Sequence, residues 1–372
     1  MHHLAPTPAL LRPKDLRGLL KALVPFVVLA AIVTLPGRAA ADTVISQERA
    51  PSKVSAELNR VVWSSYDPAT GDYSLMSRDV VGAVTKLPVA PRKVPFDVDL
   101  GFLGEGAEVA AYSRCKLEAR LTGGGSGGLL PNYATGRGCD IYLFDFEAQR
   151  EVKYAPTAGG SASEFLPSVS PAGRIAFARV YEHRKGSRGR LPYLYEKRGN
   201  HSSRRLPGGA RGTTGLPGPT SLDLGGSRLA FTWGYRPTGR RSLAYDVRVD
   251  VVRGSHRVLQ SVRSATVSRS LMSPSIVLRN VLWGRALVVG NGGRSDFLDD
   301  GDSLRGGTRH AQAPNFLVET SGVPSRGGIY YLTTQSPMPS GPAGKAPACG
   351  VPTDAYPATC TLARTDTLAF VR

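Results

Sequence analysis

Short apolar runs separated by turn residues dominate the chain beyond residue 55. The runs are rich in Val, Tyr, Phe, Thr and Leu, whereas Gly, Pro, Asn and Asp lie between them. No long stretch of this part of the chain repeats apolar residues at the 3.6-residue period of a helix. Because short runs bounded by turn signals are typical of strands, the pattern predicts an all-β protein.

One phrase occurs twice in this pattern. Residues 164–179 read EFLPSVSPAGRIAFAR, and residues 217–233 read PGPTSLDLGGSRLAFTW. Each copy has a Pro, a short β stretch, a Gly turn, and then Arg, Ile or Leu, Ala and Phe. The equivalent residues Ile175 and Leu229 are 54 positions apart. Repeats of this length predict a β-propeller of four-stranded blades. We expect six blades over residues 58–372, with seven as the alternative.

The repeat resembles that of TolB-like propeller proteins, an exported bacterial family. The segments that carry the resemblance are LPSVSPAGRIAFAR (166–179) and CDIYLFDFEAQREVKY (139–154). It implies that the first segment forms the inner strand, the turn and the second strand of a blade. The second segment then forms the third and fourth strands. Ala172 stands where the family pattern has Asp. The resemblance implies a fold rather than an activity, because propellers host unrelated activities.

The N-terminus has the pattern of an export signal. Four basic residues at positions 12, 14, 17 and 21 precede an apolar run over 22–35, and small residues Ala39 and Ala41 follow it. This order predicts a cleaved signal peptide over 1–41, with an uncleaved membrane anchor as the alternative. We expect residues 42–57 to be a flexible N-terminal segment. The protein is then secreted or lies in the cell envelope.

The cysteine count supports an oxidising compartment. An even number of cysteines in an exported protein predicts disulfides, and four allow three pairings. Local order favours two bridges that each close a polar loop. The expected pairs are Cys115 with Cys139 and Cys349 with Cys360.

Long polar loops and a positive charge predict a binding surface. The formal net charge is +18, and +14 of it lies after residue 41. The resemblance implies that the loops joining the second and third strands of each blade all emerge on one rim. Several of these loops are long for a compact domain. Arginine there suits phosphate or carboxylate groups, and a solvated surface is the alternative. The candidate binding residues are Arg184, Lys185, Arg188, Arg190, Tyr193, Arg236, Arg240 and Arg241.

The expected partner of this rim is an envelope protein or an anionic polymer. Nucleic acid is not expected for an exported chain, and contact with a membrane is expected only through an uncleaved N-terminus. We expect a monomer. These expectations predict a non-enzymatic binding or scaffolding module.

An acidic segment is a candidate cation site. Residues 296–302 read DFLDDGD, in which Asp296, Asp300 and Gly301 match three positions of an EF-hand loop. The ligands expected at two further positions are replaced by Leu298 and Gly307. Calcium held in another geometry by carboxylates is one interpretation, and a solvated turn is the other. The candidate ligands are Asp296, Asp299, Asp300 and Asp302. No other cofactor is expected.

Candidate catalytic groups are few. Asp97 and Asp99 alternate along PFDVDLG and so lie on one side of a strand, where a propeller's central channel could use them in acid/base chemistry. The match to G-x-S-x-G at 124–128 lies in a glycine run without the strand–turn–helix context of a nucleophilic serine. A hydrolase or lyase with acid/base residues in the channel is therefore the alternative function.

Overall fold

The computed structural model describes the strands and many of their turns. The described residues are 43–48, 53–57, 60–79, 81–104, 106–118, 137–154, 162–170, 172–181, 193–199, 201–206, 218–240, 242–251, 255–263, 268–277, 279–288, 294–304, 306–312, 320–322, 330–335 and 360–365. All regular structure in these residues is β-structure, which confirms the all-β prediction. Within them, no helix has the length and apolar character to cross a membrane. The predicted signal peptide over 1–41 lies outside the described residues.

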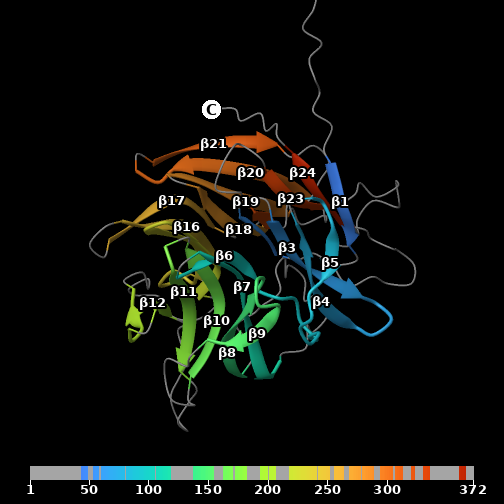
Figure 1. Ribbon diagram of the computed structural model, residues 1–372. Helices are drawn as coiled ribbons and strands as arrows, with labels where there is room; N and C mark the ends of the chain where they lie inside the picture. The colour runs from blue at the N-terminus through green and yellow to red at the C-terminus, as the bar shows by residue number, and fades with distance from the viewer. Residues whose placement is uncertain are drawn as a thin grey trace, which may run out of the picture. The chain divides into compact units, whose positions relative to one another are not determined.

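The strands form six four-stranded antiparallel sheets (Figure 1). The first sheet contains β2 (Val54–Glu57), β3 (Arg60–Asp67), β4 (Asp72–Arg78) and β5 (Val84–Lys86). The second contains β6 (Asp99–Leu103), β7 (Ala107–Leu117), β8 (Arg137–Asp145) and β9 (Arg150–Lys153). The third contains β10 (Ala162–Ser170), β11 (Arg174–Tyr181), β12 (Tyr193–Arg198) and β13 (Arg204–Arg205).

The remaining three sheets lie in the second half of the chain. The fourth contains β14 (Gly218–Gly225), β15 (Arg228–Tyr235), β16 (Ala244–Val251) and β17 (Ser255–Arg263). The fifth contains β18 (Ser268–Val277), β19 (Asn280–Val288), β20 (Arg294–Asp302) and β21 (Gly306–Gln312). The sixth combines β22 (Thr320–Gly322), β23 (Tyr330–Gln335) and β24 (Cys360–Thr365) with β1 (Thr43–Glu48).

The first strands of successive sheets contact one another in a closed order. β2 contacts β6, β6 contacts β10, β10 contacts β14, β14 contacts β18, β18 contacts β22, and β22 contacts β2. This cyclic order is the arrangement of a β-propeller, in which the inner strands surround a common axis. We call these six the inner strands.

The sheets close through the N-terminal strand. β1 pairs with β24, from Thr43 opposite Arg364 to Glu48 opposite Cys360 (Figure 1). The sequence also predicts that strands near Val61 close the ring against residues 367–372; those residues lie outside the described ones, and the closing pair that the structure describes is β1 with β24. The pairing covers the edge of β24, where free strand groups would otherwise favour association.

The segment expected to be flexible, 42–57, forms β1 and β2 instead. Residues of 43–48 and 53–57, the described parts of this segment, make buried contacts. Glu48 is 3% exposed and accepts hydrogen bonds from the Trp63 indole N–H, at 2.6 Å, and from the Ser46 hydroxyl. Val54 packs in the same cluster as Trp63 and Leu362. The segment therefore becomes ordered through polar and apolar contacts with other strands.

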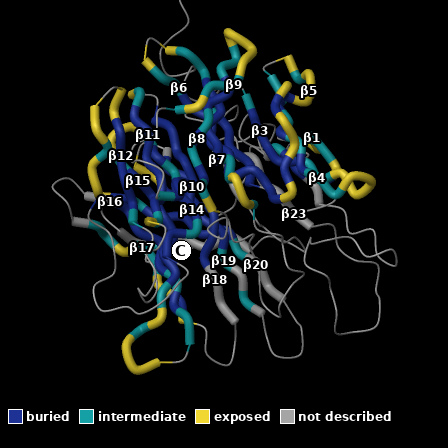
Figure 2. The backbone as a smooth tube through the Cα atoms, turned by 90° about the horizontal axis from the view of Figure 1, so that it is seen from below, coloured by how far each residue is buried: buried dark blue, intermediate teal, exposed yellow. Residues whose placement is uncertain are grey.

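The repeated phrase has the same packing role in both copies. In β11, Ile175 and Phe177 pack against the second sheet, whereas Ala176 and Ala178 pack toward the fourth. In β15, Phe231 packs toward the third sheet and Ala230 toward the fifth. Large residues thus face the preceding sheet and alanines the following one, as strand alternation requires. Figure 2 shows the buried strand interiors and the exposed turns around them.

One of the long polar loops that the sequence predicts covers residues 292–327, and this segment contains strands. β20, β21 and β22 all lie within it, so the expectation of one long loop is wrong there. Two acidic residues of β20 pair with arginines: Asp299 with Arg285 and Asp302 with Arg279. Ion pairing lets a strongly polar sequence form a strand that its composition does not suggest.

Candidate active site

A ladder of polar side chains joins neighbouring inner strands. The members are Ser55, Asp99, Ser168 and Asp223, and each accepts a hydrogen bond from a backbone N–H of the next inner strand. The amide donors are Leu100 at 3.0 Å, Val169 at 2.8 Å, Leu224 at 2.7 Å, and Ile276. The ladder residue always stands directly before an apolar residue of its own strand. Serine and aspartate alternate along it, because both offer an oxygen acceptor.

Two of the four contacts use the same tripeptide, Asp-Leu-Gly, at 99–101 and 223–225. A Cβ at Gly101 would lie 2.5 Å from the Val169 carbonyl oxygen, and a Cβ at Gly225 would lie 2.6 Å from that of Ile276. In each copy the aspartate therefore binds the amide of one residue while the glycine leaves room for the carbonyl of the same residue. Glycine serves here for close backbone approach. The repeated tripeptide is the sequence signal that could have found this feature.

Asp99 is saturated with partners. One carboxylate oxygen accepts the Ser55 hydroxyl at 2.8 Å, and the other accepts the Ser168 hydroxyl at 2.8 Å and the Val169 amide. The ammonium of Lys53 lies 3.9 Å from it. Asp99 is 2% exposed and Lys53 7%. This carboxylate holds strands together and has little capacity left for a ligand.

Asp223 occupies the equivalent position but has a different environment. Burial, and then the negative charge of Asp99, raise the pKa of Asp223 to about 7, while the Ile276 amide, Lys53 and Ser275 act in the opposite direction. Residue 223 as a whole has intermediate exposure to solvent, unlike Asp99. A carboxyl with this pKa changes between its acid and base forms at neutral pH, which is what proton transfer in catalysis requires.

Two polar groups beside Asp223 lack hydrogen-bond partners among the described residues. The Lys53 ammonium is one, although it lies within ion-pair distance of Asp99. The Ser221 hydroxyl is the other, and it shares a face of β14 with Asp223, two residues away. Buried polar groups are normally satisfied. We call Lys53, Asp99, Ser221 and Asp223 the inner-strand cluster.

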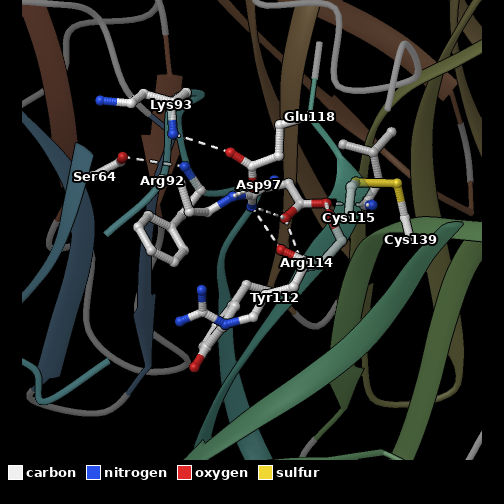
Figure 3. A network of polar contacts seen from close by, with 12 residues as sticks. Ser64, Arg92, Lys93, Asp97, Tyr112, Arg114, Cys115, Glu118 and Cys139 are labelled. Carbon is white, nitrogen blue, oxygen red and sulfur yellow. Dashed lines mark hydrogen bonds and ion pairs between the residues drawn. A yellow bond between two sulfur atoms is a disulfide. The ribbon is translucent and has the colours of Figure 1, made fainter. Parts of the chain in front are cut away.

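Asp97, predicted as a channel carboxylate together with Asp99, has a structural role. It accepts hydrogen bonds from the Ser113 amide and hydroxyl and from the Leu166 amide of β10. Arg92 lies 3.5 Å away, 4% exposed, and pairs also with Glu118 at 2.7 Å. Figure 3 shows Arg92 between Asp97 and Glu118. This network fixes the chain entering β6 against the end of β7, and so positions Asp99.

The disulfide between Cys115 and Cys139 is confirmed. The two cysteines lie opposite each other in the β7–β8 pair, beside the Arg92 network (Figure 3). Glu118, which accepts hydrogen bonds from the Arg92 guanidinium and the Lys93 amide, follows Cys115 by three positions. Cys349 lies outside the described residues, so its bridge to Cys360 stays a prediction.

Most of the predicted basic rim lies outside the described residues. This applies to Arg184, Lys185, Arg188, Arg190 and Arg241. Arg236 and Arg240 are exposed in the turn after β15. Tyr193 begins β12, and the Arg205 guanidinium lies 3.5 Å from its ring centre, so this ring is already covered on one face.

The candidate calcium ligands lie in β20 rather than in a loop. Asp299 and Asp300 are neighbours in the strand and so point to opposite faces. Among the residues the structure describes, no three His, Cys, Asp or Glu side chains gather as a metal site would need. Calcium binding at Asp296, Asp299, Asp300 and Asp302 stays a prediction.

No family model and no curated protein matches the chain. Similar solved structures include the α-L-arabinanase of Penicillium chrysogenum complexed with arabinobiose. It is 10% identical, the match covers 87% of this chain and 97% of that chain, and the TM-score is 0.46. A second is a Mycobacterium tuberculosis puromycin-hydrolyzing peptidase, which is 11% identical over 77% of this chain with a TM-score of 0.44. The chain spans 50% of that peptidase. A third, described as a TolB from Agrobacterium tumefaciens, has 16% identity, 55% of this chain, 62% of that chain and TM-score 0.34.

The expectation of a non-enzymatic binding or scaffolding module is corrected. Several of the similar solved structures are named as peptidases or as arabinose-releasing enzymes, and none of those reported is named as a scaffold. At such identities the likeness concerns the fold, and a fold does not specify an activity. The chemistry has to be argued from the inner-strand cluster.

Proposed function

We propose that the protein is a hydrolase whose general acid/base is Asp223. The observation that carries this proposal is a carboxyl whose pKa is raised to about 7, on an inner-strand residue of intermediate exposure that lies among buried charges. Strongly perturbed carboxyls of this kind are concentrated at functional sites. The ladder explains why an acceptor stands at position 223, because it accepts the Ile276 amide. It does not require an aspartate, since serine has the same role at Ser55 and Ser168.

The neighbours of Asp223 supply the rest of the chemistry. In its acid form the carboxyl donates a proton to the leaving group of the scissile bond, and in its base form it accepts one from water. Burial, and then the negative charge of Asp99, keep the acid form populated, because both oppose ionisation of Asp223. The Lys53 ammonium is a fixed positive charge, without a hydrogen-bond acceptor, that can stabilise negative charge developing on the substrate.

We also propose that the protein works outside the reducing cytosol. The Cys115–Cys139 disulfide supports this, because such bonds persist in oxidising compartments. The basic and apolar N-terminal pattern of the sequence is consistent with export. Membership of the TolB-like family stays part of this proposal and is supported by the two repeat segments. Engagement of an envelope protein or anionic polymer is a separate, untested prediction.

The test is a hydrolysis screen of the purified chain with chromogenic esters, glycosides and aminoacyl amides, followed by kinetics on whichever substrate is cleaved. We expect Asp223→Asn to lower kcat by about 100-fold or more. The wild-type rate should follow an apparent pKa near 7, and this dependence should be absent in the variant. The matched control is Asp140→Asn, which removes a partly exposed partner of Lys153 far along the chain from β14.

Two results would contradict the proposal. One is unchanged kcat in a folded Asp223→Asn variant. The other is a product that contains a new double bond and no oxygen from isotopically labelled water, since that product would identify a lyase.

A further inference from the structure

We propose that the inner-strand cluster binds an uncharged, polyhydroxylated part of the substrate, a saccharide unit. This inference rests on the proposed hydrolase and names its substrate class. It starts from two unpartnered groups of the cluster: the Lys53 ammonium, 7% exposed, and the Ser221 hydroxyl, 4% exposed. Burying such groups without hydrogen bonds costs free energy, and a bound ligand would recover it.

The charges of the cluster disfavour an ionic ligand. An anion attracted by Lys53 would meet the carboxylates of Asp99 and Asp223, and a cation attracted by these carboxylates would meet Lys53. With Asp223 in its acid form, the positive charge of Lys53 and the negative charge of Asp99 cancel. A neutral ligand is therefore the one that avoids an unpaired charge in this partly desolvated place.

The remaining hydrogen-bonding groups match hydroxyls. The Lys53 ammonium only donates, whereas the Ser221 hydroxyl and the acid form of the Asp223 carboxyl each donate and accept. A ligand that satisfies all three within a small volume needs several neighbouring groups that each donate and accept. Adjacent hydroxyls of a sugar ring meet this requirement, whereas an apolar ligand would leave Lys53 and Ser221 unsatisfied.

The ladder disfavours the main competing ligand, an extended peptide. A peptide that binds by strand addition needs free backbone amides on the strand it joins. At the inner strands, the amides of Leu100, Val169, Leu224 and Ile276 already donate to the ladder side chains. At these four positions recognition is left to side chains, which suits a saccharide.

The test measures binding to the full chain carrying Asp223→Asn, so that turnover does not consume the ligand. The probes are neutral oligosaccharides of several sugar types, the same types carrying uronic acids, and extended peptides, each titrated by calorimetry. We expect a neutral oligosaccharide to bind. Adding Ser221→Ala or Lys53→Met should weaken that binding about tenfold, the loss expected for one hydrogen bond of about 1.4 kcal/mol.

The control is Lys93→Met, which removes an exposed lysine paired with Asp72 and should leave the affinity unchanged. Ser221→Ala keeps the test decisive if Lys53→Met fails to fold, because it removes a hydroxyl that has no partner in the described residues. Binding of only charged sugars or peptides, or of none of the probes, would overturn the inference. So would neutral-sugar binding that is unaffected by Ser221→Ala.

The two proposals fail separately. Neutral-sugar binding without any turnover by the wild-type chain would support the ligand and overturn the hydrolase. Turnover of a substrate that is not a saccharide, lost with Asp223→Asn, would support the hydrolase and overturn the ligand.

Discussion

Asp99 and Asp223 occupy equivalent places in two copies of one tripeptide, yet they differ in chemistry. Each accepts the amide of the next inner strand, and each is followed by a glycine that lets that strand approach. Asp99 has two serine hydroxyls and Lys53 around it and is almost fully buried. Asp223 has fewer partners, partial exposure and a raised pKa. The repeat determines that the aspartate binds a backbone amide. The neighbouring residues determine whether its carboxyl can also exchange a proton near neutral pH.

The sheets around the two aspartates differ in the same direction. The sheet of β6 is secured by the Arg92–Asp97–Glu118 network and by the Cys115–Cys139 disulfide. The sheet of β14 contains no cysteine. Asp99 therefore lies in a strongly cross-linked part of the molecule, and the comparison predicts that equivalent substitutions will have unequal effects on the free energy of unfolding.

The largest expected effect is that of Asp99→Asn. It leaves the Lys53 ammonium buried without its ion-pair partner and weakens the Ser55 and Ser168 contacts. We expect a loss of about 3–5 kcal/mol, the range for breaking a buried pair on one side. Chemical denaturation near pH 7 measures it. Asp223→Asn, examined under the same conditions, should not destabilise the protein; equal losses for both variants would remove the distinction drawn between the two sites.

The next effect concerns the disulfide. Replacing Cys115 and Cys139 together by serine opens a loop with a sequence separation of 24 residues. The chain-entropy model gives a loss of about 3 kcal/mol for such a loop. Thermal unfolding with and without reductant should show the same decrease for the reduced wild type and the double variant. A double variant as stable as the oxidised protein would show that the Arg92 network alone secures this sheet.

The glycines of the two tripeptides should respond alike, because the backbone geometry is shared. Gly101→Ala and Gly225→Ala each place a methyl group against a carbonyl oxygen of the next strand. Overpacking of this kind costs about 1–3 kcal/mol, and more where the backbone cannot move. Gly104→Ala is the control: nothing lies within 4 Å of the added Cβ, although its φ of +56° adds some strain. If only one of the two glycines were sensitive, the two copies would not be equivalent.

The sequence predicted the fold better than the site. The repeated Arg-Ile-Ala-Phe phrase identified residues whose packing is the same in both sheets, because strand alternation is a local property. The count and local order of the cysteines also predicted the Cys115–Cys139 disulfide, whose cysteines lie opposite each other in neighbouring strands. The site depends on residues far apart in the chain, such as Lys53 and Asp223. The sequence around each residue does not show that the two are close in space or that they are buried. Only the recurring Asp-Leu-Gly tripeptide could have indicated this site from the sequence.

The smallest expected effect is the pH dependence of stability that Asp223 introduces. Its pKa is 3.8 in an ordinary environment and about 7 here, so between these values the folded protein holds a proton that the unfolded chain has released. The contribution is therefore most favourable below pH 4, falls as pH rises, and is fully lost above 7. Asp223→Asn removes this dependence, while the amide oxygen can still accept the Ile276 N–H.

We expect Asp223→Asn to be about 1–2 kcal/mol more stable than the wild type near pH 8, less than the pKa difference alone implies because solvent screens a partly exposed group. Near pH 4, close to the ordinary pKa of the carboxyl, the two proteins should differ little. Denaturation at both pH values measures the difference, with Asp140→Asn as the surface control. A gain that is the same at both values would mean that the carboxyl does not titrate in this window. Asp223 would then have the same purely structural role as Asp99. If Asp223→Asn is instead more stable but less active than the wild type near pH 8, the acid/base group lowers the stability of the fold.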